Sequence, residues 1–79
     1  MVKQIKVSLV EEVEKATISF WYVKEGVEIK KGEQLVELVT EKTSFTFESP
    51  FSGKITKIMA EEGKEIVNNQ VIAEIETND

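Results

Sequence analysis

Lysine is the first residue type to consider, because Lys42 stands where two predicted strands meet. The polar segment Glu41-Lys42-Thr43 lies between the apolar run Leu35–Val39 and the alternating run Phe45–Phe47. So short a connection predicts a tight hairpin with Lys42 projecting from its tip, where nothing nearby would bury it. Taken alone, a lysine at a polar turn is most often a solvated side chain. An exposed lysine on a rigid arm is nevertheless the main functional candidate of this chain.

The composition excludes most other chemistry. The 79 residues include 15 acidic and 10 basic side chains, giving a formal net charge of -5, and there is no Cys or His. Without Cys and His, the chain has no thiol nucleophile, Ser-His-Asp triad or zinc cluster, and most redox metal sites are excluded. No catalytic residue or metal site is therefore expected, and reactive chemistry must be imported. All basic residues are lysines, which together with the negative charge argues against a nucleic-acid partner.

The length fits one small domain spanning residues 1–79. No apolar run approaches the length of a membrane span, and the N-terminal sequence MVKQIKVSLV has too short an apolar stretch for a signal peptide. We therefore expect no membrane partner and a cytoplasmic location, or the mitochondrial matrix in a eukaryote.

Abundant β-branched residues and closely spaced turn signals predict an all-β fold. Short strands at such spacing favour a compact antiparallel sandwich or a flattened barrel, which limits the number of unpaired edges. The expected strands are Lys3–Leu9, Ala16–Val23, Val27–Ile29, Gln34–Thr40, Thr43–Glu48, Gly53–Met59, Glu65–Val67 and Val71–Glu76.

The two halves of the chain are similar to each other. Residues 18–39 align with residues 55–76 at a constant offset of 37, and both apolar positions and turn positions are kept. The identical pairs are Ile18/Ile55, Glu25/Glu62, Gly26/Gly63, Glu28/Glu65, Ile29/Ile66 and Glu37/Glu74. The similar pairs are Leu35/Ile72, Leu38/Ile75 and Gly32/Asn69. An approximate two-fold axis between the halves would explain why turns match turns.

A series of motifs keeps a fixed order around Lys42, with Gly26 sixteen residues before it and Gly53 eleven residues after it. The set reads Gly26, Leu35–Val39, Glu41-Lys42-Thr43, Phe45–Phe47, Ser49-Pro50 and Gly53. Over essentially the whole chain, it resembles the lipoyl domains of 2-oxo acid dehydrogenase complexes, which are members of the biotinyl/lipoyl attachment family. The resemblance implies a barrel-sandwich hybrid: a flattened antiparallel barrel or sandwich of two four-stranded sheets with pseudo-two-fold symmetry.

The resemblance also implies a role for Lys42, as the residue that carries lipoate in an amide bond. Such a domain is a non-catalytic swinging-arm carrier and part of a dihydrolipoamide acyltransferase. The implied partners are a lipoate-attaching ligase or transferase, a thiamine diphosphate-dependent 2-oxo acid decarboxylase, the acyltransferase core and dihydrolipoamide dehydrogenase. The dithiolane chemistry would belong to the cofactor, which fits a chain without cysteine.

The residues beside the lysine depart from the usual family triplet of Asp-Lys-Ala, because this chain has Glu41 before Lys42 and Thr43 after it. We expect these neighbours to contribute to recognition by the attaching enzyme or to the turn itself. Two alternatives remain at this stage. One is a biotin carboxyl carrier, although that subfamily typically has Met on both sides of the lysine. The other is an unmodified binding or scaffold module of the same fold.

The remaining motifs have plainer interpretations. Gly26 and Gly53 are predicted to be fold residues that need unusual backbone angles, and Trp21, Phe45 and Phe47 are predicted to pack in the core or across strands. The acidic run Glu11, Glu12 and Glu14 is expected to be a solvated loop, and its role in selecting a decarboxylase partner rests on the resemblance.

Overall fold

The computed structural model describes residues 1–9 and 14–78. Within these ranges the chain forms strands and turns, and no helix is long and apolar enough to cross a membrane. The strands are β1 (Val2–Lys6), β2 (Lys15–Trp21), β3 (Glu28–Ile29), β4 (Gln34–Val39), β5 (Ser44–Glu48), β6 (Gly53–Ile58), β7 (Glu65–Val67) and β8 (Val71–Glu76). The all-β prediction is confirmed.

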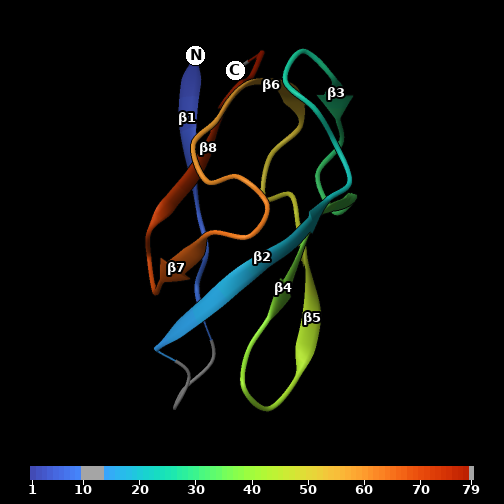
Figure 1. Ribbon diagram of the computed structural model, residues 1–79. Coiled ribbons are helices and arrows are strands. Elements are labelled where there is room, and N and C mark those ends of the chain that lie inside the picture. The colour runs from blue at the N-terminus through green and yellow to red at the C-terminus, as the bar shows by residue number, and fades with distance from the viewer. Residues whose placement is uncertain (10–13, 79) are drawn as a thin grey trace.

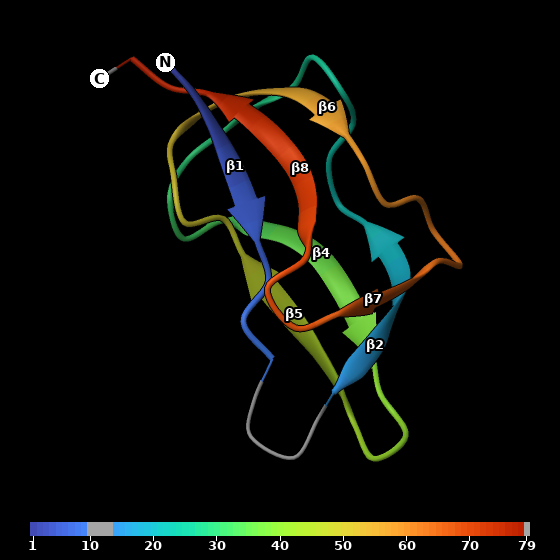
Figure 2. The same cartoon turned by 90° about the vertical axis from the view of Figure 1, so that its left-hand side faces the viewer.

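The strands form two four-stranded antiparallel sheets, ordered β1-β8-β6-β3 and β5-β4-β2-β7. Figures 1 and 2 show them as the two layers of a flattened sandwich. Among the described residues no ladder joins one sheet to the other, so the fold is the predicted flattened sandwich of two four-stranded sheets and not a closed barrel. The edge strands β3 and β7 are only 2 and 3 residues long, too short to extend a ladder around the molecule.

The first strand is shorter than predicted. Expected to run to Leu9, it ends at Lys6, where a register shift between Ile5 and Lys6 interrupts its pairing with β8. Beyond this point the chain bonds to the β7–β8 turn instead: the Asn69 amide donates to the Val7 carbonyl at 2.8 Å. The apolar pattern continues through Leu9 because Val7 and Leu9 remain buried, although neither lies in the strand.

The two halves correspond bond by bond, which explains the repeat in the sequence. The Gly26 amide donates to the Ile55 carbonyl, and the Gly63 amide donates to the Ile18 carbonyl, both at 2.7 Å. The two bonds are related by exchange of the halves, since Gly63 lies 37 positions after Gly26 and Ile18 lies 37 positions before Ile55. The sheet orders correspond in the same way, since β5, β4, β2 and β7 take the places of β1, β8, β6 and β3.

The repeated glutamates tie each half to the other. A carboxylate oxygen of Glu62 accepts a hydrogen bond from the Trp21 amide at 3.0 Å, at the end of β2. A carboxylate oxygen of Glu25 accepts one from the Ile58 amide at 2.8 Å, at the end of β6. Each half therefore supplies the acceptor that satisfies a strand end of the other half, where an unpaired amide would be costly.

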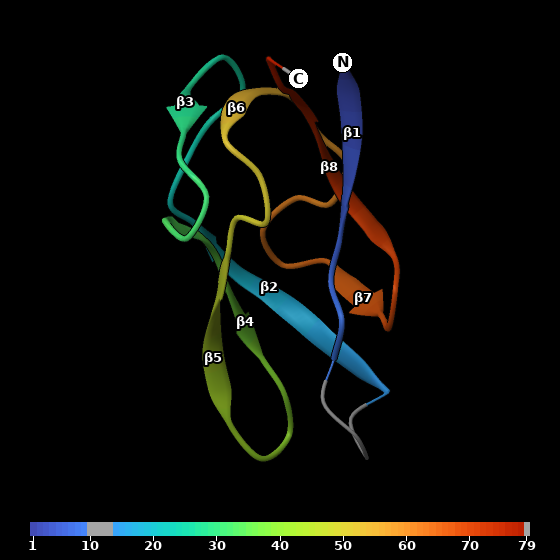
Figure 3. The same ribbon diagram turned by 180° about the vertical axis from the view of Figure 1, so that it is seen from behind.

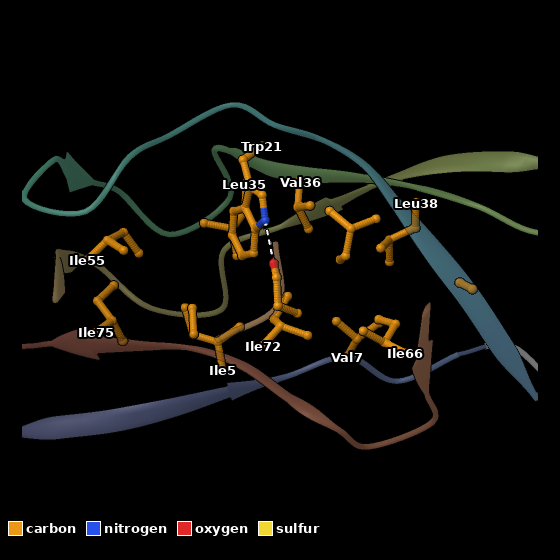
Figure 4. Close-up of a cluster of buried hydrophobic side chains, with 14 of the residues drawn as sticks. Ile5, Val7, Trp21, Leu35, Val36, Leu38, Ile55, Ile66, Ile72 and Ile75 are labelled. Atoms are coloured by element: carbon orange, nitrogen blue, oxygen red, sulfur yellow. Dashed lines mark hydrogen bonds between the residues drawn. The ribbon is translucent and has the colours of Figure 1, made fainter. Parts of the chain in front are cut away.

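The core lies between the two sheets (Figure 4). Leu38 and Ile75 are 0% exposed, as are most of the aliphatic side chains around them. The Trp21 side chain can be buried in this core because its polar indole N–H donates a hydrogen bond to the Ala60 carbonyl at 2.8 Å. The close-up shows Leu35, Val36 and Leu38 of β4 opposite Ile5, Ile72 and Ile75.

The predicted glycine roles divide into two kinds. Gly26 has a φ of 92°, in the left-handed region that other residues avoid, as the sequence predicted. For Gly53 the prediction of an unusual angle is wrong, because it is not among the described positive-φ residues. Its constraint is a close approach: a Cβ there would overlap the Glu76 carbonyl oxygen and lie 3.1 Å from Ile75 Cγ1.

The molecule is elongated, with principal extents of 36 × 20 × 19 Å. Figure 3 shows the β4–β5 hairpin at one end and the two termini together at the other. The termini are joined by hydrogen bonds: the Met1 ammonium donates to the Thr77 carbonyl at 2.8 Å, and the Thr77 amide donates to the Met1 carbonyl at 2.8 Å. Lys42 therefore projects at the end farthest from the points where a longer chain would connect.

Candidate functional site at the β4–β5 hairpin

The hairpin that carries Lys42 is anchored at its base by the core. In its ladder Leu38 faces Phe45, and Val39 faces Ser44. Leu38 is fully buried and Phe45 packs partly buried against the core, so the last inward-facing pair fixes both strands close to the turn. Alternation of side chains along the strands leaves Val39 and Ser44 on the outer face, where they are exposed.

The tip is closed by Thr40 and Thr43. The Thr40 amide donates to the Thr43 carbonyl at 2.7 Å, and the Thr40 hydroxyl donates to the same carbonyl at 3.0 Å. In return, Thr40 Oγ1 accepts hydrogen bonds from the amides of Thr43 at 3.1 Å and Lys42 at 3.3 Å. Only Glu41 and Lys42 lie between the two threonines, so the turn is as short as the sequence predicts.

Lys42 is exposed at this tip, together with Glu41 and Thr43. Within residues 1–9 and 14–78 its ammonium makes no hydrogen bond or ion pair with another side chain. Two surface grooves formed by described residues lie away from this tip. One is lined by Lys3, Gln4, Lys6, Pro50 and Phe51, and the other by residues of β3, β6 and the β8 end. The site is therefore an exposed primary amine at the tip of the hairpin.

Comparison with known proteins identifies the family. The protein-family model for biotin and lipoyl attachment, described as "Biotin-requiring enzyme", matches residues 3–75. This chain belongs to the biotinyl/lipoyl family. The resemblance inferred from the ordered motifs around Lys42 is therefore confirmed.

A relative from Rickettsia bellii (strain RML369-C) is a dihydrolipoyllysine-residue succinyltransferase component of 2-oxoglutarate dehydrogenase complex. It is 42% identical over 74 residues, which cover 94% of this chain and 18% of that protein. The described chain thus corresponds to a small part of a much longer relative.

Two solved structures share the fold of this biotinyl/lipoyl domain. The lipoyl domain of the 2-oxoglutarate dehydrogenase complex from Azotobacter vinelandii has a TM-score of 0.76 at 22% identity, over 96% of this chain and 98% of that one. A single-chain, multi-domain long-chain acyl-CoA carboxylase has a TM-score of 0.82 at 14% identity, over 99% of this chain and 7% of that one. Because proteins with different reactions share this fold, the fold alone does not select the attached group.

Three aromatic residues, Trp21, Phe45 and Phe47, pack in or against the core, as the sequence predicted. Trp21 is buried, and Phe45 and Phe47 pack partly buried against the core. Phe20 and Tyr22 are 49% and 40% exposed and pack edge to face, with ring centroids 5.1 Å apart. No aromatic residue of the described chain lies at the tip with Lys42.

The structure adds one residue to the predicted site. Thr40 was expected only as the last residue of a strand, whereas its hydroxyl organises the turn that carries Lys42. A threonine two residues before an exposed hairpin lysine is a usable sequence signal, because Ser and Thr hydroxyls often bond to backbone groups nearby. The predicted partner-selecting residues Glu11 and Glu12 lie outside the described residues.

Proposed function

We propose that this domain is a lipoyl carrier of a 2-oxo acid dehydrogenase complex, with lipoate joined to Lys42 by an amide bond. The observation that carries the proposal is the geometry of the hairpin: an exposed amine at a two-residue tip whose strands are anchored in the core. Membership of the biotinyl/lipoyl family and the 42% identity to a succinyltransferase component support it.

The residues at the tip fit covalent attachment. An exposed primary amine is open to an attaching enzyme, and its side chain makes no contact that the modification would break in the described structure. The attached group supplies the dithiolane chemistry, which the chain cannot supply because it has no Cys. The chain's own task is to hold the attachment point away from its surface and away from its termini.

The proposed partners follow from this carrier role. A lipoate-attaching ligase or transferase would modify Lys42, and the carrier would serve a thiamine diphosphate-dependent 2-oxo acid decarboxylase, the acyltransferase core and dihydrolipoamide dehydrogenase. We also place the domain within a dihydrolipoamide acyltransferase, in which the carrier itself is not catalytic. An elongated domain with Lys42 and the termini at opposite ends suits delivery by a tethered module.

The neighbours of Lys42 favour lipoate over biotin. Glu41 and Thr43 are exposed on either side of the lysine, where an attaching enzyme would contact them. Biotin carriers of this family typically have Met at both positions. Discrimination between the two attaching enzymes is expected to depend on these side chains, since the fold is common to both classes.

An attachment assay with purified components tests the proposal. The chain is incubated with lipoate, ATP and a lipoate-attaching ligase, and its intact mass is measured. One lipoyl group is expected on the natural chain and none on Lys42→Arg. Lys31→Arg is the matched control, because Lys31 is an exposed lysine at another turn, and it should be modified like the natural chain. Labelling that persists in Lys42→Arg would exclude Lys42 as the attachment point.

The choice of cofactor is tested by the double substitution Glu41→Met and Thr43→Met with a biotin ligase in the same assay. The double variant is expected to gain biotin acceptance that the natural chain lacks. Efficient biotinylation of the natural chain without lipoylation would favour the biotin carrier instead.

A further inference from the structure

The Thr40 side chain uses all of its hydrogen-bonding capacity on the hairpin tip. A hydroxyl has one donor and two acceptor lone pairs. The donor of Thr40 goes to the Thr43 carbonyl at 3.0 Å, and its two acceptor positions receive the amides of Thr43 at 3.1 Å and Lys42 at 3.3 Å. One side chain thereby fixes three backbone groups in the two residues that follow Glu41.

The other end of the molecule provides an internal comparison. Thr77 lies 37 positions after Thr40, and its amide donates to the Met1 carbonyl at 2.8 Å, as the Thr40 amide does to the Thr43 carbonyl at 2.7 Å. Its hydroxyl donates to the Met1 carbonyl at 3.2 Å. The donor bonds are therefore common to both halves. Among residues 1–9 and 14–78, the two bonds that Thr40 accepts have no counterpart at Thr77, and they concern the lysine-bearing turn.

We propose that Thr40 is a positioning residue for the modification of Lys42. Its hydroxyl holds the Lys42 backbone in one conformation, so that the amine leaves the hairpin from a fixed point and in a fixed direction. This inference rests on the proposed function, because it concerns how the attaching enzyme receives the lysine.

The physical reason is preorganisation. Lys42 and its neighbours are exposed, so packing contributes little to the shape of the turn. Without the hydroxyl, the amides of Lys42 and Thr43 would turn to water and the tip would sample other conformations. An enzyme that acts on the amine would then have to order the tip on binding, which lowers the efficiency of attachment.

Three variants separate positioning from stability. Thr40→Val keeps the branched shape and removes the hydroxyl, Thr40→Ser keeps the hydroxyl, and Thr77→Val makes the same change at the equivalent position far from Lys42. Steady-state lipoylation with a lipoate-attaching ligase should show kcat/KM lower by about ten-fold or more in Thr40→Val, the scale expected for a misplaced reacting group. Thr40→Ser and Thr77→Val should react like the natural chain.

Two further measurements do not depend on the attaching enzyme. Amide hydrogen exchange, followed by NMR, should become faster at Lys42 and Thr43 in Thr40→Val and stay unchanged in Thr77→Val. Acylation of Lys42 by a small water-soluble active ester should proceed at the same rate in all variants, because the amine is exposed in each. Urea unfolding should show that Thr40→Val loses no more stability than Thr77→Val.

Each outcome bears on the proposal. Lipoylation of Thr40→Val at the natural rate would overturn the positioning role while leaving Lys42 as the attachment point. An equal loss of kcat/KM in Thr40→Ser would overturn the role of the hydroxyl. A loss of kcat/KM in Thr40→Val that matches its loss of folded protein would overturn the assignment to positioning. A natural chain that takes no lipoyl group would contradict the proposed function itself, and the positioning role with it.

Discussion

At the scale of single residues, Lys42 and its neighbours have separate tasks. The Lys42 side chain is solvated, whereas the Thr40 hydroxyl and the backbone groups of Thr40 and Thr43 hold the turn. The carrier role proposed for Lys42 therefore places no demand on its side chain for folding.

Removal of the lysine side chain should leave the fold intact. Lys42→Ala is expected to change the free energy of unfolding by no more than about 0.5 kcal/mol, as exposed substitutions away from caps and cores generally do. Urea unfolding of the variant beside the natural chain measures this. A large loss of stability would mean that Lys42 is structurally engaged, and the carrier proposal would lose its main physical support.

At the scale of elements, the geometry of the β4–β5 hairpin sets the direction of each side chain at its turn. Strand side chains alternate between faces, and the short turn leaves only Glu41 and Lys42 between the paired threonines. A lysine placed one position away from residue 42 would therefore point in another direction, toward the ladder instead of outward from the tip.

Exchange of Lys42 with Thr43 is therefore expected to abolish lipoylation without unfolding the domain. The hydrogen bonds of Thr43 that close the turn are made by its backbone amide and carbonyl, which any residue supplies. The lipoylation assay and an unfolding curve should be run on the same preparation. Normal lipoylation of the exchanged variant would show that attachment does not depend on the exact position of the lysine in the turn.

The close approach of β6 to β8 gives a second prediction at this scale. In Gly53→Ala the new Cβ would overlap the Glu76 carbonyl oxygen, a backbone atom, so the strands must shift apart. The expected loss is about 1–3 kcal/mol, the usual cost of overpacking. The free energies of unfolding of this variant and of the natural chain test this prediction. An unchanged free energy would show that the end of β6 can move away from β8 without cost.

At the scale of the whole molecule, two related halves enclose one core. Leu38 and Ile75 occupy equivalent positions, 37 residues apart, and both are 0% exposed. Their similar surroundings in the two sheets predict similar contributions to stability.

Truncation at these two positions should be costly to a similar degree. Leu38→Ala and Ile75→Ala are each expected to lose about 2–5 kcal/mol, through lost burial and the cavity left behind. Denaturant unfolding measures both, with Val67→Ala as an exposed control at 53% exposure. A loss confined to one of the two would contradict the equivalence of the halves.

Sequence reasoning reached the strands, the repeat and the hairpin because alternation, turn residues and the offset of 37 are local or periodic signals. It missed the end of β1, because Val7 and Leu9 stay buried after the ladder stops. It also misjudged Gly53 and overlooked Thr40, since both depend on neighbours that only the folded chain brings close. The cytoplasmic location stays a prediction.

Mass spectrometry is the most direct test of the proposal that Lys42 carries lipoate. The chain is purified from a host that attaches both lipoate and biotin, its intact mass is measured, and the modified peptide is mapped. We expect one lipoyl group, on Lys42, in the natural chain and an unmodified chain in Lys42→Arg. A chain that carries biotin, a lipoyl group on another lysine, or no group at all would contradict the proposal.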